Sequence, residues 1–313
     1  MKKIADPSLQ QQEKVNSYFQ SQSAFWKEIY ESNGVYAQIH RDRYATVLAW
    51  IDSLMLTADS KVLEIGCGAG LLSVALAQRG LRVHAIDSVE DMVEQARRHA
   101  MESGTAELLS VNLGNVYSLP FENGSFDLVI VIGVIPWLEE PELAIQEMVR
   151  VTKSAGYLLL TADNRARLNV VLDPWLNPAL VPLKQRVKDT LDRIGLRRKS
   201  LHDIGATSHS RRFIDLTLKR FELVKTRSIT LGFGPFSLLH RRILPESLGI
   251  RLHYQLQRLA DRNVPVFRSS GAHYIVLARK SASQLYVLSP SDAQSISKLQ
   301  KYYDNDESME VHK

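Results

Sequence analysis

A glycine-rich turn after a short apolar run predicts a ligand site in this sequence. The run Ser60–Ile65 is typical of a β-strand, and Glu64, Gly66, Gly68 and Gly70 form the pattern E-x-G-x-G-x-G at its end. Glycines allow a sharp turn and a close approach to a ligand, because no Cβ intervenes. The helix expected to follow offers free backbone N–H groups at its start. We therefore expect a small molecule to bind at this turn.

A carboxylate ends the next predicted strand. Asp87 follows the run Arg82–Ile86, where it can accept hydrogen bonds from both ribose hydroxyls of an adenosine. The dinucleotide pattern G-x-G-x-x-G would need glycine at the position of Leu71, and the phosphate loop G-x-x-x-x-G-K-S/T is absent. The spacing therefore matches neither the dinucleotide pattern nor the phosphate loop. A simpler interpretation remains open, in which the glycines only form a turn and Asp87 caps a helix starting near Ser88.

Further residues, in the same order along the chain, resemble the class I S-adenosylmethionine-dependent methyltransferases of the ubiquinone/menaquinone type (methyltransferase type 11 domain). The segments 114–121 and 124–127 resemble the stretch GDA-x-x-LPF…SFD of that family. The family has an acidic residue that contacts the adenine amino group, where this chain has Asn115. The Asn115 carbonyl can accept the same hydrogen bond without a charge, or Asn115 is a plain turn residue. The segment 133–137 matches the part of the family that borders the transferred methyl group. The resemblance covers roughly residues 36–161, with weaker support at 221–279.

The resemblance implies S-adenosyl-L-methionine as the cofactor. Methyl transfer from a sulfonium is an in-line displacement, for which the protein supplies binding, alignment and exclusion of water. We therefore expect no metal site, and the sequence singles out no catalytic base. The cofactor-binding residues are expected to be Glu64, Gly66, Cys67, Gly68, Gly70, Asp87, Ser88, Met92, Asn115, Val116, Ile132 and Gly133.

The methyl acceptor is expected to lie over the carboxyl ends of the strands. Candidate residues for its site are Tyr36, His40, Trp137, Phe233 and Phe236. For Trp137 and for the segment 232–236, a role in ordinary core or turn packing is an equal alternative. The N-terminal pattern from Tyr18 to Tyr30 is similar to magnesium-protoporphyrin O-methyltransferases, which implies a bulky, partly apolar acceptor.

A doubly wound α/β fold would bring these residues together. Runs typical of strands alternate with helical segments, which predicts parallel pairing and right-handed crossovers. We expect a seven-stranded, mostly parallel, Rossmann-like sheet with N-terminal helices and helical insertions. The predicted strands are 60–65, 82–86, 108–111, 126–132, 156–161, 221–231 and 272–279. The predicted units are a helical lid at 1–56, a cofactor-binding core at 57–164, a helical cap at 165–212, the rest of the sheet at 213–280 with an insertion at 232–270, and a polar tail at 281–313.

Length and composition restrict the classes of protein to which this chain can belong. The chain has 313 residues, of which 45% are hydrophobic and 23% charged, which fits one large domain with an insertion or at most two domains. Cys67 is its one cysteine, so an internal disulfide is excluded. Neither a signal peptide nor an apolar run of about 20 residues is evident. We expect a soluble, cytoplasmic protein.

Charge is unevenly distributed, and its meaning is open. The net charge is +5, but residues 165–268 hold 21 Lys/Arg against 8 Asp/Glu. This excess could face an anionic acceptor, a membrane or lipid surface, or nucleic acid, or be the solvated surface of a cap. We favour a small-molecule acceptor. A nucleic-acid methyltransferase is disfavoured because segment 133–136 lacks an Asn/Asp-Pro-Pro-aromatic motif, and a non-catalytic cofactor binder remains an alternative. The sequence does not predict the oligomeric state.

Overall fold

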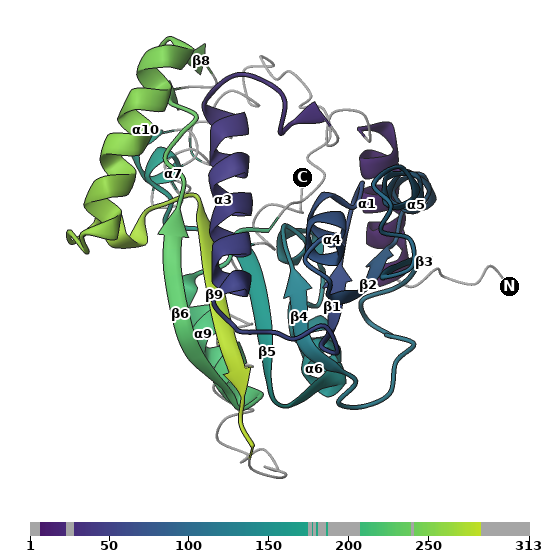
Figure 1. The fold of residues 1–313 in the computed structure, drawn as a ribbon. Coiled ribbons are helices and arrows are strands. Elements are labelled where there is room, and N and C mark those ends of the chain that lie inside the picture. Colours follow the sequence, from purple (N-terminus) through teal and green to yellow (C-terminus); the bar gives the residue numbers. More distant parts are fainter. Residues whose placement is uncertain are drawn as a thin grey trace, which may run out of the picture.

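The fold is a twisted α/β sheet flanked by helices on both faces (Figure 1). The computed structural model describes residues 7–22, 28–174, 207–238 and 241–282, together with positions 177, 180 and 186. Its main sheet has seven strands in the order β3-β2-β1-β4-β5-β9-β6, in which β9 runs antiparallel to both of its neighbours. The strands are β1 (Lys61–Ile65), β2 (Arg82–Asp87), β3 (Leu109–Leu113), β4 (Phe126–Val131), β5 (Thr152–Asp163), β6 (Leu223–Leu231) and β9 (His273–Lys280). The mostly parallel Rossmann-like sheet expected from the sequence is thus confirmed.

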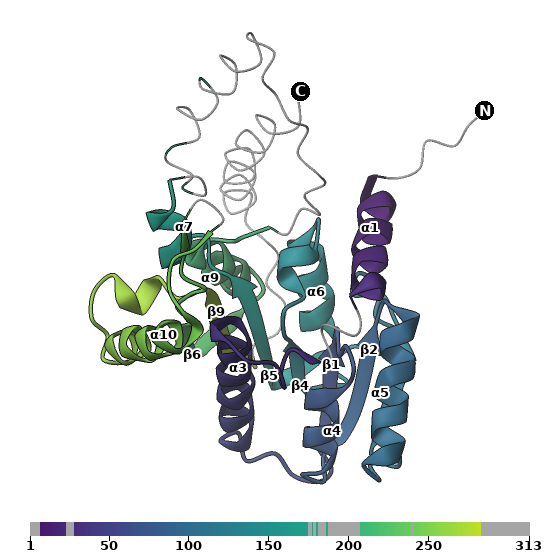
Figure 2. The same ribbon diagram turned by 90° about the horizontal axis from the view of Figure 1, so that it is seen from above.

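Helices cover the sheet in two layers (Figure 2). One face is covered by α3 (Val35–Asp52), α4 (Leu71–Ala77) and α5 (Glu90–Glu102), and the other by α6 (Pro141–Val151) and α9 (Arg211–Arg220). Outside these layers, α10 (Glu246–Asp261) packs against α3, and α1 (Pro7–Ser21) lies close to the start of α5. The shorter elements are η1 (Ile135–Trp137), α7 (Leu168–Leu172), η3 (Phe267–Ser269) and a two-stranded sheet of β7 (Ser237–Leu238) and β8 (Arg241–Arg242).

Strand β4 shows why the sequence folds into these layers. Leu128 and Ile130 pack in the core beneath α3, α4 and α5, whereas Val129 and Val131 pack beneath α6 and α9. All four side chains are fully buried. A strand covered on both faces has no solvent side, so its sequence is continuously apolar rather than alternating.

Two elements differ from the sequence prediction. Helix α1 begins at Pro7, within the expected helical lid at 1–56 but at a start that the sequence did not mark, because its first turns are polar and show no apolar periodicity. Proline is favourable in a first helical turn. Strand β5 is longer than the predicted 156–161, because its ends continue into Thr152 and Asp163. Most of the expected cap at 165–212, and the expected tail beyond position 282, lie outside the described residues.

None of the helices in the described ranges is both long and apolar enough to span a lipid bilayer.

Candidate functional site

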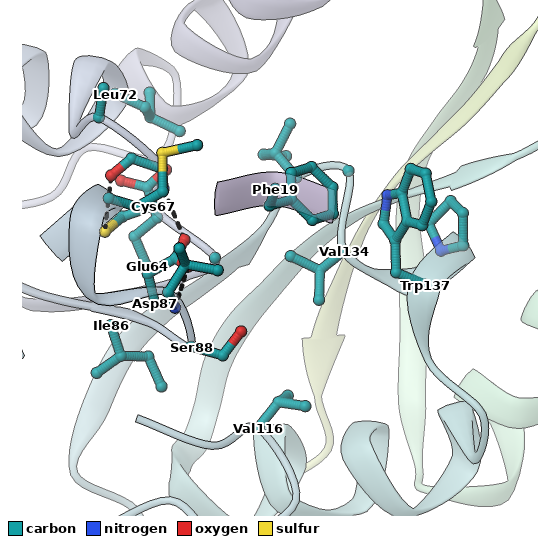
Figure 3. A pocket seen from close by; sticks show the side chains of 18 of the residues that line it. Phe19, Glu64, Cys67, Leu72, Ile86, Asp87, Ser88, Val116, Val134 and Trp137 are labelled. Carbon is teal, nitrogen blue, oxygen red and sulfur yellow. Dashed lines mark hydrogen bonds between the residues drawn. The ribbon is translucent and has the colours of Figure 1, made fainter. Parts of the chain in front are cut away.

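A pocket lies at the carboxyl ends of β1, β2, β4 and β5, where a doubly wound sheet binds its ligands. In Figure 3, the acidic and glycine-turn residues lie toward one end of it, and Phe19, Val134 and Trp137 toward the other. Most residues that the sequence predicted for the cofactor line this pocket, namely Glu64, Gly66, Cys67, Gly68, Asp87, Ser88, Met92, Asn115, Val116, Ile132 and Gly133. Gly70 does not line it.

The glycine turn has the backbone geometry that the sequence predicts. Gly66, Gly68 and Gly70 have φ values of +71°, +53° and +80°, in the left-handed region that side-chain-bearing residues rarely adopt. A Cβ on Gly66 would collide with Val134 on the opposite pocket wall, and a Cβ on Gly70 would lie 2.9 Å from the Cβ of Ala96 in α5. Gly70 therefore serves the packing of the turn on α5 and not the pocket surface.

Asp87 is fixed between this turn and the start of α5. Its Oδ2 accepts a hydrogen bond from the Gly68 N–H at 2.9 Å, and its Oδ1 accepts one from the Val89 N–H at 3.0 Å. Burial raises the pKa of Asp87, while the hydrogen bonds from these backbone groups oppose the rise. Asp87 thus holds Val89, the residue just before α5, and also lines the pocket.

Glu64 is a second acid in the same wall. It is 4% exposed, and the Ser73 hydroxyl donates a hydrogen bond to its Oε2. Burial raises the pKa of Glu64 to about 8, with a further rise from the nearby charge of Asp87 and an opposing effect of the Ser73 hydrogen bond. One buried and one partly buried acid at this end of the pocket favour a ligand with a positive charge there.

Helix α1 covers part of the pocket. The Asn16 Nδ2 donates to the Ser88 carbonyl at 3.3 Å, and the Ser88 hydroxyl donates to Asn16 Oδ1 at 2.9 Å. Further along the helix, Tyr18 stacks on Trp137 with ring centroids 5.5 Å apart, and Phe19 meets Trp137 edge-on at 5.0 Å. The sequence predicted a helical lid at 1–56 but not which residues of α1 line the pocket, since these depend on spatial contacts with Ser88 and Trp137.

The residues predicted for the acceptor divide into two groups. Tyr36, His40 and Trp137 line the pocket. Phe233 and Phe236 do not: Phe233 is buried and faces Phe267, and Phe236 packs in the small core cluster that contains Val35. The segment 232–236 is therefore the packed turn that the sequence left as the alternative.

The sequence did not indicate that three charged or titratable residues belong to the pocket. Arg43 from α3, Asp163 from the end of β5 and His273 from the start of β9 line the pocket beside His40. His273 Nδ1 lies 3.1 Å from Asp163 Oδ1, and Arg43 Nη2 donates to His40 Nδ1 at 2.9 Å. Burial, reinforced by the charge of Arg43, lowers the pKa of His40 to about 2, so His40 is neutral. The pairing of β9 with β5 brings His273 to Asp163, whereas Arg43 and His40 come from α3, and no local motif marks this group in the sequence.

Among the residues that the structure describes, no group of three or more His, Cys, Asp or Glu side chains could hold a metal ion.

The known proteins to which this chain is similar include methyltransferases, which agrees with the position of the pocket and with the strand order of the sheet. Residues 63–160 match the family described as methyltransferase domain. The chain is similar to the ubiquinone biosynthesis O-methyltransferase of Pseudomonas aeruginosa, with 36% identity over 120 residues, which are 37% of this chain and 50% of the relative. For the enzyme of the same name from Xanthomonas euvesicatoria, identity is 34% over 119 residues, covering 38% and 49%. The chain spans about half the length of these relatives.

Solved structures share the fold over most of the chain. Magnesium protoporphyrin IX methyltransferase from Synechocystis, with bound SAH, aligns with a TM-score of 0.58 and 20% identity over 87% of this chain and 100% of that one. The cyclase SpnF aligns with a TM-score of 0.54 and 16% identity over 86% and 96%. Together with the glycine turn, the strand order and the family match, these findings show that the protein contains a class I S-adenosylmethionine-dependent methyltransferase domain at residues 63–160.

Proposed function

We propose that this protein transfers a methyl group from S-adenosylmethionine to a small, partly apolar molecule. The main support for this proposal is that the two ends of a single pocket are lined by chemically different residues. One end has the glycine turn with Glu64 and Asp87, and the other has aromatic and basic side chains from α1, α3 and η1. A single space of this kind suits a donor and an acceptor side by side.

The residues of the first end fit the cofactor. Asp87 is held by two backbone N–H groups and would accept hydrogen bonds from the ribose hydroxyls. Glu64 would favour the positively charged methionine portion. Asn115 Oδ1 accepts a hydrogen bond from the Tyr117 N–H at 2.9 Å, which leaves its second lone pair for the adenine amino group. When bound, S-adenosylmethionine supplies an electrophilic methyl group; the protein residues align the acceptor with it and exclude water.

The other end supports a small acceptor with an apolar part. Phe19, Val134 and Leu138 are apolar lining residues, and the contacts of α1 with Trp137 limit the size of what can enter. The similarity to ubiquinone biosynthesis O-methyltransferases supports transfer to an oxygen atom. We also propose that the protein acts in the cytoplasm, which is consistent with a free, buried thiol at Cys67.

The direct test is an acceptor screen with the purified protein. It is incubated with S-adenosylmethionine carrying a labelled methyl group and with hydroxylated aromatic compounds, quinols, RNA or DNA, and products are identified by mass. We expect label in a small molecule, with production of S-adenosylhomocysteine, and loss of both in Asp87→Ala. Label in RNA or DNA would support a nucleic-acid methyltransferase instead. Cofactor binding without label in any acceptor would support a non-catalytic binder.

A further inference from the structure

Asp163 and His273 form a hydrogen-bonded pair that faces the pocket. They are directly opposite each other in the antiparallel pairing of β5 with β9, so their side chains lie on the same side of the sheet. His273 Nδ1 lies 3.1 Å from Asp163 Oδ1, and Arg167 also holds Asp163, at 3.3 Å. A carboxylate only accepts hydrogen bonds, so the neutral His273 carries its proton on Nδ1. Its Nε2 then keeps a lone pair that can accept a proton.

His273 is neutral in the resting protein. Burial lowers its pKa, and the positive charges of Arg43 and Arg167 add to this effect, against the opposing influence of Asp163. Among the other titratable groups that the structure describes, the neutral His40 lies 5.9 Å from His273 between ring centroids, and Tyr36 contacts His40. His209 interacts electrostatically with Asp163. An unprotonated imidazole nitrogen oriented by a carboxylate is suited to accept a proton from a ligand.

Arg43 brings a positive charge into the same space, where Asp163 is the anion whose charge it feels. It is 7% exposed, and its Nη2 donates to the neutral His40. Its Nε is buried with no hydrogen-bond partner among the described residues, and its interaction with the Asp163 carboxylate is through space rather than through a hydrogen bond. A buried charge is costly unless it is paired. A negative group on a ligand would supply the missing hydrogen-bond partner.

The guanidinium lies over the loop that follows β4. A Cβ added to Gly133 would lie 3.6 Å from Arg43 Nη1 and 3.8 Å from Nη2. Gly133 and Arg43 both line the pocket that also contains Asp87 and the glycine turn. The cation, the proton acceptor and the cofactor end therefore border one continuous space.

We propose that His273, positioned by Asp163, removes the proton of a phenol-type hydroxyl on the acceptor, while Arg43 binds the oxygen that becomes negative. This inference rests on the proposed methyltransferase function and names its acceptor class and its base. The hydroxyl proton moves to His273 Nε2, and the oxygen forms a bond to the methyl carbon as the bond from that carbon to sulfur breaks. The electron pair of the broken bond stays on the sulfur, which gives S-adenosylhomocysteine, and His273 then releases the proton to solvent.

The first experiment needs no turnover. The full-length protein, saturated with S-adenosylhomocysteine, is titrated with nitrophenol and nitrocatechol, whose ionised forms absorb visible light. We expect the bound probe to ionise at least about one pH unit below its value in water, since an opposite charge at contact distance shifts a pKa by this amount or more. In Arg43→Gln the shift should disappear while the affinity for S-adenosylhomocysteine is unchanged. Arg79→Gln, which removes an exposed arginine outside the pocket, is the matched control.

The second experiment distinguishes a catalytic base at His273 from a residue that only supports the structure. In wild type, kcat for phenols should fall as the pH falls through the pKa of His273. His273→Gln should lower kcat at least about 100-fold, the usual contribution of a general base, with little change in KM. The acid limb of its pH profile should vanish, and the loss should be smaller for nitrophenol, whose proton leaves more easily. Asp163→Asn should act in the same direction, and His84→Gln, outside the pocket on β2, should have no effect.

Several outcomes would overturn the inference. An unchanged probe ionisation in Arg43→Gln, an unchanged kcat and pH profile in His273→Gln, or no binding or methylation of any phenol would each do so. Methylation of carboxylic acids alone would also do so, since a carboxylate needs no base. If wild type does not bind S-adenosylhomocysteine at all, the proposed methyltransferase function itself fails, which the first titration reveals before any variant is made.

Discussion

At the scale of single residues, Glu64 has a proton that cofactor binding is expected to displace. Its buried carboxyl has a pKa of about 8, above the ordinary value of 4.5, so it is largely protonated at neutral pH. The sulfonium and ammonium groups of S-adenosylmethionine would favour the ionised form. Because the proton must leave on binding, affinity should rise with pH, by up to about tenfold per unit, and level off above pH 8.

Calorimetric titration between pH 6 and 9, in buffers of different ionisation enthalpy, measures both the affinity and the released proton. Glu64→Gln should bind more weakly at pH 8 and show neither the pH dependence nor the proton release. Glu102→Gln, on the surface of α5, is the control. A flat affinity in wild type with no proton release would show that Glu64 does not ionise on binding.

Local motifs predicted one end of the pocket and missed part of the other. Glu64, the glycine turn and Asp87 are close in sequence or end adjacent strands, so spacing alone places them together. Arg43, Asp163 and His273 come from three distant segments, and their proximity depends on how β9 inserts beside β5. Phe233 was misassigned because an aromatic residue between glycines has the same pattern whether it lines a pocket or packs in a core.

At the scale of elements, α1 is attached to the rest of the site by few polar contacts. Asn16 makes two hydrogen bonds with Ser88, next to the cofactor residue Asp87. Asn16→Ala removes both, and since a hydrogen bond contributes about 1 kcal/mol net, bound cofactor should dissociate roughly tenfold faster. Stopped-flow release of S-adenosylhomocysteine measures this rate.

Amide hydrogen exchange provides the second measurement for this helix. Residues 7–22 should exchange faster in Asn16→Ala, with no change in the strands. Ser21→Ala is the matched control, because the Ser21 hydroxyl bonds only within α1, to the Tyr18 carbonyl. Equal release rates in all three proteins would show that α1 does not retain the cofactor.

Elements that carry an apolar pattern were predictable, and those held by tertiary contacts were less so. The buried strands stand out as apolar runs, and β4 was predicted to within one residue of Phe126–Val131. The first turns of α1 have no apolar period, so the sequence did not mark where in the expected lid at 1–56 this helix begins. The two residues beyond the predicted end of β5, Ala162 and Asp163, extend it because they pair with β9, which is a long-range contact.

At the scale of the whole molecule, buried neutral histidines should make the fold sensitive to acid. Burial lowers the pKa of His40 to about 2 and that of His209 to about 4, from 6.5. Below pH 6.5 the unfolded chain binds protons at these sites before the folded one does. The free energy of unfolding should therefore fall as the pH falls from 6.5 toward 4, by up to about 1.4 kcal/mol per unit for each histidine.

Urea unfolding between pH 4 and 7.5 measures this dependence. His209→Gln should flatten the slope below pH 6.5, because it removes one of these sites from both states. His99→Gln, a partly exposed histidine of α5, should retain the wild-type slope. If wild type and His209→Gln lose stability in parallel, His209 is not held neutral by the fold.

The glycine turn and Asp87 are expected to bind an adenosyl cofactor that carries a methyl group. Calorimetric titration with S-adenosylmethionine, S-adenosylhomocysteine and NADH tests this expectation most directly. We predict micromolar or tighter binding of both sulfur compounds, no binding of NADH, and at least about tenfold weaker binding in Asp87→Ala, as expected when charge-assisted hydrogen bonds are lost. Binding of NADH, or sulfur-compound affinities that do not change in Asp87→Ala, would contradict the account.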